Sequence, residues 1–574
     1  MINLTIDGLP VQAREGTTVL EAANQLNIRI PTLCHHPDQD VKANCRICVV
    51  ECEGVPALIP ACAYTVFEGM VIRTNAPKVR KARMHILELI MARHAQDCLH
   101  CKRSGSCELQ DISENMHFVK TPRYPYRARS TAVDESSSCI MRTASKCIAC
   151  GRCEYACNEV QTVHAISKVN RGFEVNYVPT YDRPLGESVC VGCGQCVQVC
   201  PTGALTIADE NDIVWNTIGT GKTIVAQVAP SVRINLAEAL DENPGTLSTG
   251  RLVTAMKRMG FDTIFDTDVS ADLTIMEEGT ELLERLKNGG VLPMITSCSP
   301  GWIKFCETYY PDMIPNLSTC KSPQQMFGAL IKTYYTKKIG KDPQDILSVS
   351  VMPCTAKKFE AKRPEMGRDG YRDIDAVITV QELARMIRAA GIDFESLPAT
   401  PFDDPFGIGT GAGEIFGATG GVTEAALRTV YELVTGETLD DIDFEQVRGF
   451  EGIKDASIRI GDMDLKVAVA HGLGNARKLM DAVREGKADY HFIEIMACPG
   501  GCIGGGGNFL RTWKKMKPRL EAVYIEDRNM LVRKSHENPA VQALYKEFLG
   551  EPNGNKSHEL LHTSYTDRSY LLGN

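Results

Sequence analysis

The sequence predicts a multidomain protein in which three small cysteine-rich modules precede one large α/β domain. At about 150 residues per domain, a length of 574 residues suggests three or four domains. Seventeen of the 23 cysteines lie between Cys34 and Cys200, and the other six are spread over the 374 residues that follow. From about residue 210 onward, strand-like apolar runs alternate with helix-like runs, which favours α/β architecture. We expect domains at residues 1–78, 79–118, 139–209 and 210–574.

The composition excludes several classes of protein. Hydrophobic residues make up 43% and charged residues 24%, both near the globular average, so the chain is not disordered as a whole. No run of about 18 uncharged apolar residues is present, so we expect no membrane partner. The net charge of −9 argues against nucleic acid as a partner. The opening residues lack a basic stretch followed by an apolar one, so we expect no secretory signal and a cytoplasmic location. In that compartment 23 thiols indicate metal ligation rather than disulfides.

The first module is expected to be small and β-rich. Residues 3–6 alternate polar and apolar side chains, residues 8–10 form a turn, and a short helix begins near Thr18. Four cysteines have a spacing that resembles the plant-type ferredoxin loop, although the first gap is longer than usual. Four thiolates suit either a 2Fe–2S cluster or zinc. The candidate ligands are Cys34, Cys45, Cys48 and Cys62. Cys52 is interpreted as a buried apolar thiol.

The second module begins with a helical run over residues 81–90 and continues into another group of ligands. One histidine with three thiolates suits either zinc or a 4Fe–4S cubane. The second module lies between two modules of iron–sulfur type. A redox-silent zinc would interrupt a chain of electron carriers, so we favour the cubane. The candidate ligands are His94, Cys98, Cys101 and Cys107. Residues 119–138, with two prolines and three consecutive serines, are expected to be a linker.

The third module contains the strongest local pattern, two runs of Cys-x2-Cys-x2-Cys-x3-Cys. This is the spacing of bacterial two-cluster ferredoxins, in which the fourth cysteine of each run ligates the other cluster. A pair of zinc sites is the alternative, but zinc ribbons use separated Cys-x2-Cys pairs. We assign one cubane to Cys147, Cys150, Cys153 and Cys200. We assign the other to Cys190, Cys193, Cys196 and Cys157. Cys139 receives no role.

The large domain carries isolated cysteines in three distant loops. Residues 223–229 and 346–352 are predicted to be buried strands, and residues 377–390 an amphipathic helix. An iron cubane needs soft thiolates, and the glycines around the last two cysteines let backbone approach a bulky cofactor. The candidate ligands are Cys298, Cys354, Cys498 and Cys502. Cys306 and Cys320 have no motif around them and are interpreted as small buried hydrophobes.

Three segments of this domain closely resemble the signature loops of iron-only (FeFe) hydrogenases. They read Thr-Ser-Cys-Ser-Pro-Gly-Trp at residues 296–302, Met-Pro-Cys-Thr-Ala-Lys at residues 352–357 and Glu-Ile-Met-Ala-Cys-Pro-Gly-Gly-Cys at residues 494–502. The modules before residue 210 also resemble the electron-entry subunit of respiratory complex I, so the likeness covers the whole chain. The resemblance suggests clostridial ferredoxin-linked enzymes and the catalytic subunits of NAD(P)-linked hydrogenase complexes as relatives.

The resemblance implies a set of cofactors and a reaction. The H-cluster would be a 4Fe–4S cubane bridged by one cysteine sulfur to a two-iron unit with CO, CN and a dithiolate amine. Three further 4Fe–4S clusters and one 2Fe–2S cluster would carry electrons. The reaction would be reversible, with two protons and two electrons giving dihydrogen. By analogy, the cubane that contains Cys147 is expected to lie nearest the active site.

The resemblance also implies roles for residues of the large domain. Lys357 would donate a hydrogen bond to a cyanide. Glu278, Glu281 and Arg285 fall at i, i+3 and i+7, which places them on one helix face. A proton relay would run through Arg285, Glu281, Ser318, Glu278 and Cys298. The two-iron unit would be lined by Pro230, Ser231, Gln324, Met352, Phe416 and Met496. For the acidic residues of the relay, the plainer alternative is a solvated helix face. For Met352, Phe416 and Met496 it is ordinary core packing.

Ser299 is a departure from the family pattern. The family loop usually has two adjacent cysteines, of which the first passes protons and the second ligates the cubane. In one interpretation Cys298 has taken over ligation and Ser299 relays protons. In the other, Cys298 still relays, and Ser299 is an oxygen ligand or leaves one iron open. A serine hydroxyl is far less acidic than a thiol and matches iron poorly, so altered activity is expected.

The expected function is that of an FeFe-hydrogenase whose partners are ferredoxin or flavoprotein NAD(P)-linked subunits, with maturation proteins that build the H-cluster. One alternative is the hydrogen-using subunit of an electron-bifurcating NAD(P)-linked complex. No Gly-x-Gly-x-x-Gly motif follows a strand, so the chain itself is not expected to bind NAD(P). A second alternative is a sensory or electron-transfer protein whose H-site is impaired by Ser299.

Overall fold

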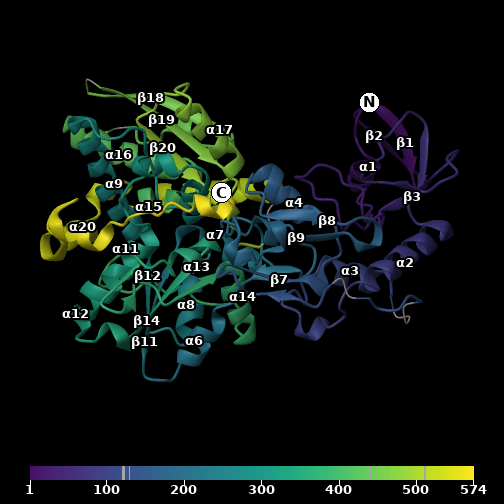
Figure 1. Ribbon diagram of the computed structural model, residues 1–574, viewed down its shortest axis with the longest axis horizontal. Helices are drawn as coiled ribbons and strands as arrows, with labels where there is room; N and C mark the ends of the chain where they lie inside the picture. The colour runs from purple at the N-terminus through teal and green to yellow at the C-terminus, as the bar shows by residue number, and fades with distance from the viewer. Residues whose placement is uncertain (119–122, 128–129, 440, 462, 510–511, 574) are drawn as a thin grey trace.

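The computed structural model describes residues 1–118, 123–127, 130–439, 441–461, 463–509 and 512–573. The cysteine-rich modules occupy one end of the molecule and the large domain the other (Figure 1). The first module contacts both the third module and the large domain, because the Gln39 amide donates to the Arg152 carbonyl at 3.1 Å and the Trp513 N–H donates to Asp38 Oδ2 at 3.2 Å. Within the described ranges, no helix combines the length and the apolar character needed to cross a membrane.

The first module is a five-stranded sheet with one packed helix, which confirms its expected β-rich character. The strand order is β2-β1-β5-β3-β4. The elements are β1 (Ile2–Ile6), β2 (Leu9–Ala13), α1 (Val19–Gln25), β3 (Val49–Cys52), β4 (Ile59–Pro60) and β5 (Met70–Arg73). The helix begins after Thr18 because the hydroxyl of Thr18 accepts from the Glu21 N–H while the Glu21 carboxylate accepts from the Thr18 N–H.

The next two modules are small and are organised around cysteine loops. The second is helical, as expected, with α2 (Pro77–Met91) and α3 (Glu108–Asn115). The third is built from β6 (Val133–Asp134), β7 (Ile140–Thr143), α4 (Arg152–Tyr155), β8 (Ile166–Val169), β9 (Asn176–Pro179), α5 (Gln195–Gln198) and β10 (Leu205–Ile207). The expected linker is wrong in its last part, because β6 pairs with β7 and the Asp134 carboxylate accepts from the Leu185 N–H at 2.8 Å. Residues 119–122 and 128–129 of that linker lie outside the described residues.

The large domain contains two four-stranded sheets, which confirms the α/β prediction. The first has the order β12-β11-β14-β17, and all its neighbours are parallel. Its strands are β11 (Thr223–Val228), β12 (Thr263–Asp266), β14 (Ile346–Met352) and β17 (Ala376–Thr379). The second has the order β13-β20-β19-β18 and is parallel except for its β18–β19 edge. Its strands are β13 (Met294–Ile295), β18 (Ile453–Ile460), β19 (Met463–His471) and β20 (Phe492–Met496).

Helices surround the two sheets. They are α6 (Asn211–Thr217), α7 (Pro230–Ala239), α8 (Thr249–Met259), α9 (Asp268–Asn288), α10 (Pro300–Tyr309), α11 (Pro323–Leu330), α12 (Thr336–Ile339), α13 (Ala356–Glu360), α14 (Val380–Ala389), α15 (Gly411–Glu414), α16 (Gly421–Thr435), α17 (Leu473–Arg484), α18 (Trp513–Asn529), α19 (Pro539–Leu544) and α20 (Asn555–Leu561). A small ribbon of β15 (Gly367–Arg368) and β16 (Tyr371–Arg372) follows α13.

The helix expected over residues 377–390 is wrong at its beginning. The chain is still in β17 up to Thr379, and α14 starts only after it. The Thr379 hydroxyl accepts from the Glu382 N–H, and the Glu382 carboxylate accepts from the Thr379 N–H, which fixes the start of the helix. An apolar run before a cap fits a buried strand as well as a helix, and the parallel pairing with β14 decides between them.

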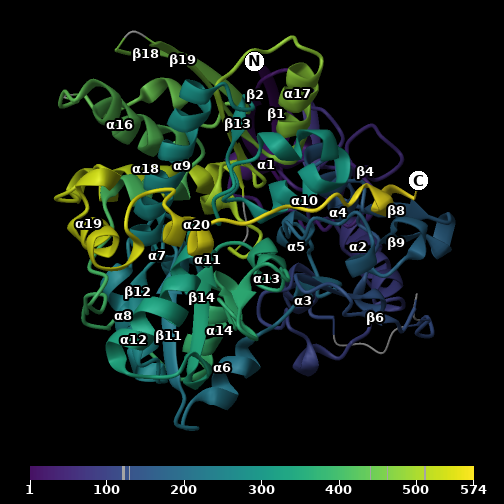
Figure 2. The ribbon, with the colours of Figure 1, turned by 60° about the vertical axis from the view of Figure 1, so that its left-hand side comes forward.

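The C-terminal segment runs across the large domain toward the third module (Figure 2). Its residue His562 forms an antiparallel bridge with Cys320, and the Arg568 N–H donates to the Glu307 carbonyl on α10 at 2.8 Å. The segment therefore packs against the loop that contains Cys320 and against α10.

Candidate active site and cluster sites

One cavity lies where the carboxyl ends of four parallel strands meet. β11 and β14 of the first sheet, and β13 and β20 of the second, are each followed by a loop that lines this cavity. Such carboxyl edges are where open α/β sheets bind ligands. The first residues of α7, α10 and α11 also line it, and each is a proline at the first helical position. Because helix N-termini carry partial positive charge, the cavity favours an anionic ligand.

Four thiols from three loops converge on this cavity. They are the predicted ligands Cys298, Cys354, Cys498 and Cys502. Burial raises the pKa of every one of them, that of Cys502 to about 12. Neighbouring thiols raise the pKa of Cys498 and Cys502 further. A soft cation would neutralise such thiols and turn them into a ligand set, so their chemistry fits an iron–sulfur cluster.

The other walls of the cavity consist of residues that the resemblance implied. The structure brings together Pro230, Ser231, Gln324, Met352, Phe416, Met496, Ser299 and Lys357. The hydroxyl of Ser231 is buried and has no hydrogen-bond partner among the described residues. A buried hydroxyl of this kind costs free energy unless a bound group pairs with it. This wall therefore fits a cofactor with polar ligands of its own.

Lys357 is fixed by a carboxylate that sequence reasoning missed. Its Nζ donates to the Cys298 carbonyl at 3.1 Å and to Glu360 Oε2 at 3.0 Å. The same Glu360 oxygen accepts from Ser322 Oγ at 2.9 Å and from Gln324 Nε2 at 3.1 Å. Glu360 lies at i+3 from Lys357 on one helix, and this spacing was the signal in the sequence.

Ser299 and Cys298 face different neighbours. The Ser299 Oγ accepts a hydrogen bond from the Ala497 N–H at 3.1 Å, which ties it to the loop of Cys498. The pKa of Cys298 is raised well above its usual value by burial and then by the carboxylate of Glu278. Cys298 therefore interacts with Glu278, and Ser299 with the loop that precedes Cys498.

Three of the predicted relay residues are joined by hydrogen bonds, whereas neither carboxyl oxygen of Glu278 has a hydrogen-bond partner among the described residues. Arg285 Nη2 donates to Glu281 Oε1 at 2.6 Å, and Ser318 Oγ donates to Glu281 Oε2 at 2.9 Å. Glu278 is 2% exposed and Glu281 is 8% exposed, so the alternative of a solvated acidic face is wrong for both. Burial, and then the charge of Glu281, raise the pKa of Glu278 to about 8. Glu278 is therefore neutral at pH 7 and able to donate a proton.

The third module brings its eight thiols together in the two expected sets. One cavity is lined by Cys147, Cys150, Cys153 and Cys200. Another is lined by Cys157, Cys190, Cys193 and Cys196. The expectation that the set of Cys147 lies nearest the active site is wrong, because Cys193 itself lines the catalytic cavity. The glycine-rich loop allows this approach, since a Cβ at Gly506 would lie 2.2 Å from the Cys193 carbonyl oxygen.

The first module gathers its four predicted thiols in two contacting pairs. The Cys45 N–H donates to Cys34 Sγ at 3.4 Å, and the sulfurs of Cys48 and Cys62 are 3.4 Å apart. Cys48 also interacts with the charge of Cys34, so the two pairs adjoin. Cys52 is buried and donates instead to the Glu53 carbonyl at 3.6 Å, consistent with its exclusion from the set.

The second module orients its histidine for metal binding. His94 Nδ1 lies 3.1 Å from the Lys146 carbonyl, which can only accept, so the ring proton is on Nδ1 and the lone pair is on Nε2. Burial lowers the pKa of His94 to about 4, so the ring is neutral. Cys101 and Cys107 lie close enough for the charge of Cys101 to raise the pKa of Cys107. Cys98 is exposed, and its carbonyl accepts from the Cys101 N–H.

Successive thiol sets that lead to a buried cavity, with a carboxylate chain on its other side, define the class of the protein. These features indicate an iron–sulfur redox protein.

Comparison with family models divides the chain in the same order. The matches are a 2Fe–2S iron–sulfur cluster binding domain at residues 1–77, the NADH-ubiquinone oxidoreductase-G iron–sulfur binding region at 83–121, a 4Fe–4S dicluster domain at 146–204, the iron-only hydrogenase large subunit, C-terminal domain at 222–506, and the iron hydrogenase small subunit at 514–568.

Relatives of known name support the same conclusion. The chain is 48% identical to the NADP-reducing hydrogenase subunit HndD of Solidesulfovibrio fructosivorans, with 100% of both chains covered. It is 39% identical to iron hydrogenase 1 of Clostridium pasteurianum, over 98% of this chain and 100% of the relative. A solved FeFe-hydrogenase from Chlamydomonas reinhardtii shares 44% identity at a TM-score of 0.55, covering 60% of this chain and 94% of the other. The chain belongs to the iron-only (FeFe) hydrogenase family and is an oxidoreductase.

Proposed function

We propose that the protein catalyses the reversible reduction of protons to dihydrogen. The observation that supports this most strongly is the convergence of thiols from three loops at the inner end of a buried relay. An H-cluster bound there would supply the redox chemistry. Its cubane would be held by Cys354, Cys498 and Cys502, with Ser299 at the fourth position. Ligation by Cys298 instead is the alternative, in which Cys298→Ser would lose the iron of the cubane.

The side chains of the cavity orient the cofactor and move protons. Lys357 would donate to a cyanide, because it is buried and its ammonium pairs with an anion. The apolar side chains Met352, Phe416 and Met496 exclude water from the two-iron unit. Protons would pass from Arg285 and Glu281 through Ser318 and Glu278 to Cys298.

Electrons would reach the cavity through the cysteine-rich modules. We propose one 2Fe–2S cluster in residues 1–78, one 4Fe–4S cluster in residues 79–118 and two in residues 139–209. The set that includes Cys193 is the last carrier before the catalytic domain, residues 210–574. Ferredoxin or a flavoprotein subunit would deliver electrons to the outer clusters.

The experiment uses the full chain produced together with H-cluster maturation proteins. We expect infrared bands of iron-bound carbon monoxide and cyanide, and hydrogen evolution from reduced viologen. Cys498→Ser should lose both, whereas Cys306→Ser, which changes another buried thiol of the same domain, should keep both. Infrared bands without hydrogen evolution, or hydrogen evolution without the infrared bands, would contradict the proposal.

A second candidate is the hydrogen-using subunit of an NAD(P)-linked electron-bifurcating complex. It is favoured by the full-length similarity to a subunit of an NADP-reducing hydrogenase. Purification from the native host under anaerobic conditions should then yield flavin-bearing subunits in constant ratio to this chain. Isolation of the chain alone, with full activity toward ferredoxin, would favour the first candidate.

A third candidate is a sensory or electron-transfer protein, favoured by Ser299 in place of a thiol ligand. It predicts assembled clusters with no hydrogen evolution from reduced viologen. The same assay therefore separates it from both enzymes.

A further inference from the structure

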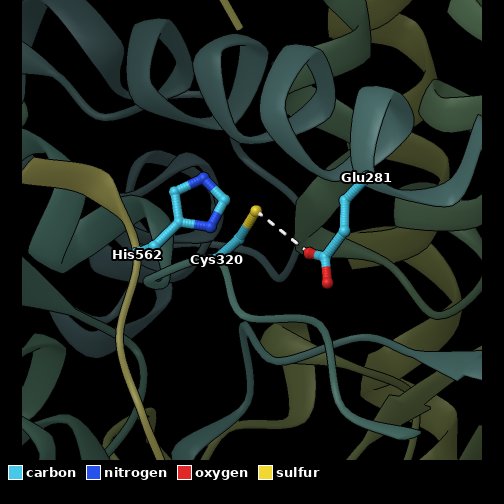
Figure 3. Close-up of side chains that lie close together, drawn as sticks. All are labelled: Glu281, Cys320 and His562. Atoms are coloured by element: carbon cyan, nitrogen blue, oxygen red, sulfur yellow. Dashed lines mark hydrogen bonds between the residues drawn. The ribbon is translucent and has the colours of Figure 1, made fainter. Parts of the chain in front are cut away.

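Three buried side chains of different chemistry lie close together at Glu281, which is also one of the predicted relay residues. They are Glu281 of α9, Cys320 of the loop before α11, and His562 of the C-terminal segment (Figure 3). One ligand atom of each lies within 4.8 Å of the other two, and all three residues are buried. Sequence reasoning had assigned Cys320 only a packing role.

The backbone fixes the positions of the thiol and the imidazole. Cys320 and His562 face each other across an antiparallel bridge. The Lys321 N–H donates to the Leu561 carbonyl at 2.7 Å, and the Thr563 N–H donates to the Thr319 carbonyl at 2.8 Å. Glu281 is held by Arg285 on its other side, and the Cys320 thiol donates to its Oε2 at 3.8 Å. The three groups are therefore brought together by the main chain and not by flexible side chains.

A second carboxylate supports the imidazole from behind. His562 Nε2 lies 3.2 Å from Glu277 Oε2, and Tyr545 Oη donates to Glu277 Oε1 at 2.5 Å. The Asn553 N–H also donates to Glu277 Oε2, at 2.7 Å. A carboxylate that orients a histidine in this way is a regular feature around metal ligands. Glu277 is completely buried, and in the described part of the chain its one ion-pair partner is His562.

We propose that Glu281, Cys320 and His562 form a binding site for zinc or a similar borderline divalent cation. Carboxylate, thiolate and imidazole are the three ligand types of protein zinc sites. Tetrahedral bonds would bring the ligand atoms to roughly 3.5 Å from one another. His562 Nδ1, which lies 2.7 Å from Thr319 Oγ1, would exchange that hydrogen bond for the bond to the metal. Binding breaks the S–H bond of Cys320, forms a metal–sulfur bond and releases the proton to solvent.

The local charges balance when the cation is bound. The thiolate of Cys320 and the carboxylates of Glu277 and Glu281 contribute three negative charges, while Arg285 and the cation contribute three positive charges. A neutral buried cluster avoids the cost of an unpaired charge in a region of low dielectric constant. The plain alternative is a hydrogen-bonded network that only anchors the C-terminal segment.

The consequence for activity rests on the proposed function. Glu281 is the carboxylate that joins Arg285 to Ser318, and a cation bound to it would take its oxygens out of proton transfer. Zinc should therefore inhibit turnover reversibly, and a chelator should restore it. The site would make hydrogen turnover sensitive to free divalent metal.

The test measures zinc binding and turnover separately on the assembled holoprotein. Equilibrium dialysis against zinc gives the number bound, and zinc K-edge X-ray absorption gives the ligands without interference from iron. We expect one tight zinc per chain with one sulfur at about 2.3 Å and the rest nitrogen or oxygen. Cys320→Ser and His562→Gln should each abolish tight binding. Glu277→Gln, which leaves all three ligands in place, should weaken it about 10- to 100-fold.

Two variants serve as controls. His536→Gln changes the other three-residue group, Glu432, His536 and Glu537, which is only partly buried. Cys306→Ser removes a buried thiol elsewhere in the domain. Both should bind zinc like the parent protein, and iron content should stay constant in every sample.

The outcomes distinguish the two proposals. Zinc bound through several sulfurs, or binding that persists in both Cys320→Ser and His562→Gln, would overturn the site. No tight zinc in the parent protein would overturn it as well. Zinc bound with the expected ligands but without inhibition would establish the site and would contradict the role of Glu281 in the relay.

Discussion

Burial changes the protonation of Glu278. Its carboxyl group lies between the relay and Cys298, and its pKa is raised to about 8 by burial and by Glu281. We predict that Glu278→Gln lowers turnover by at least about 10²-fold, because an amide cannot accept and release the proton. Infrared bands and iron content should remain unchanged. Glu284→Gln, an exposed position of the same helix, is the matched control and should keep full turnover. Equal turnover of the two variants would remove Glu278 from the relay.

The raised pKa of Glu278 can also be observed directly. A carboxyl group with a pKa of about 8 holds its proton from acidic pH up to about 8 and loses it above that value. The infrared difference between the parent protein and Glu278→Gln should therefore contain a protonated-carboxyl band at pH 6. That band should fade as the pH rises through about 8. A band that disappears near pH 4.5, the ordinary value, would show that Glu278 is solvated in the folded protein.

Cys298 and Ser299 give opposite expectations under the two interpretations of the loop. With Cys298 as the end of the relay, Cys298→Ser should keep the iron of the H-cluster and lose turnover. Ser299→Cys should keep both and should change the electron paramagnetic resonance signal of the cubane, since it adds a fourth thiolate. Loss of cubane iron in Cys298→Ser would instead identify Cys298 as the ligand.

Residues within contiguous motifs could be predicted from the sequence, whereas residues that act across the fold could not. The cavity thiols and Lys357 stand in short loops whose spacing is specific. Cys193 lies in a recognisable motif too, but its place in the catalytic cavity depends on how two modules pack. His562 is more than 200 residues from Cys320, and nothing in the sequence pattern pairs them.

The position of α7 at the cavity wall depends on one buried arginine. Arg233 pairs with Asp266 at 2.6 Å, with Asp268 at 3.3 Å and with Glu414 at 3.0 Å, and all four side chains are at most 1% exposed. Burial raises the pKa of Glu414 to about 7 and that of Asp268 well above its usual value. The cluster joins α7 to β12, α9 and α15, so it sets the place of Pro230 and Ser231.

We predict that Arg233→Met destabilises the large domain by about 3–5 kcal/mol, because it leaves buried carboxylates without their cation. Arg251→Met is the control. Arg251 makes a partly exposed pair with Glu242, at 17% and 20% exposure, and its loss should cost about 1 kcal/mol or less. Thermal unfolding followed by circular dichroism measures both. Equal midpoints would show that the buried cluster contributes no net stability.

At the level of elements, the sequence predicted strands correctly where the periodicity and the length of the apolar run agreed. The apolar runs at residues 223–229 and 346–352 are strands within one residue of their expected ends. The helix expected from residue 377 failed because its first residues pair with β14, and pairing with a distant strand leaves no local signal. The pattern also could not show that the large domain has two sheets, since strand order is set by long-range contacts.

At the scale of the whole molecule, the proposed routes of electrons and protons lie in different parts of the chain. The cysteine-rich modules extend away from one side of the large domain (Figure 1). The relay reaches the same cavity through α9 and the loop of Ser318, within the large domain. A catalyst that couples the two carriers needs this separation, because an electron can pass between buried clusters while a proton needs a chain of polar groups.

The cluster proposed in the first module should matter for protein partners more than for small reductants. Cys45→Ser removes a thiol that interacts with the thiol of Cys34, so the 2Fe–2S signal should be lost from the electron paramagnetic resonance spectrum. Turnover with ferredoxin or a flavoprotein partner should fall to near background, because we propose that electrons from these proteins enter at this cluster. Turnover with reduced viologen should be largely retained, because a small dye can reduce the inner clusters directly. Cys52→Ser, a buried thiol of the same module outside the set, should leave the signal and both activities intact. Parallel loss of both activities in Cys45→Ser, with the other clusters intact, would place the entry point for small reductants at the first module as well.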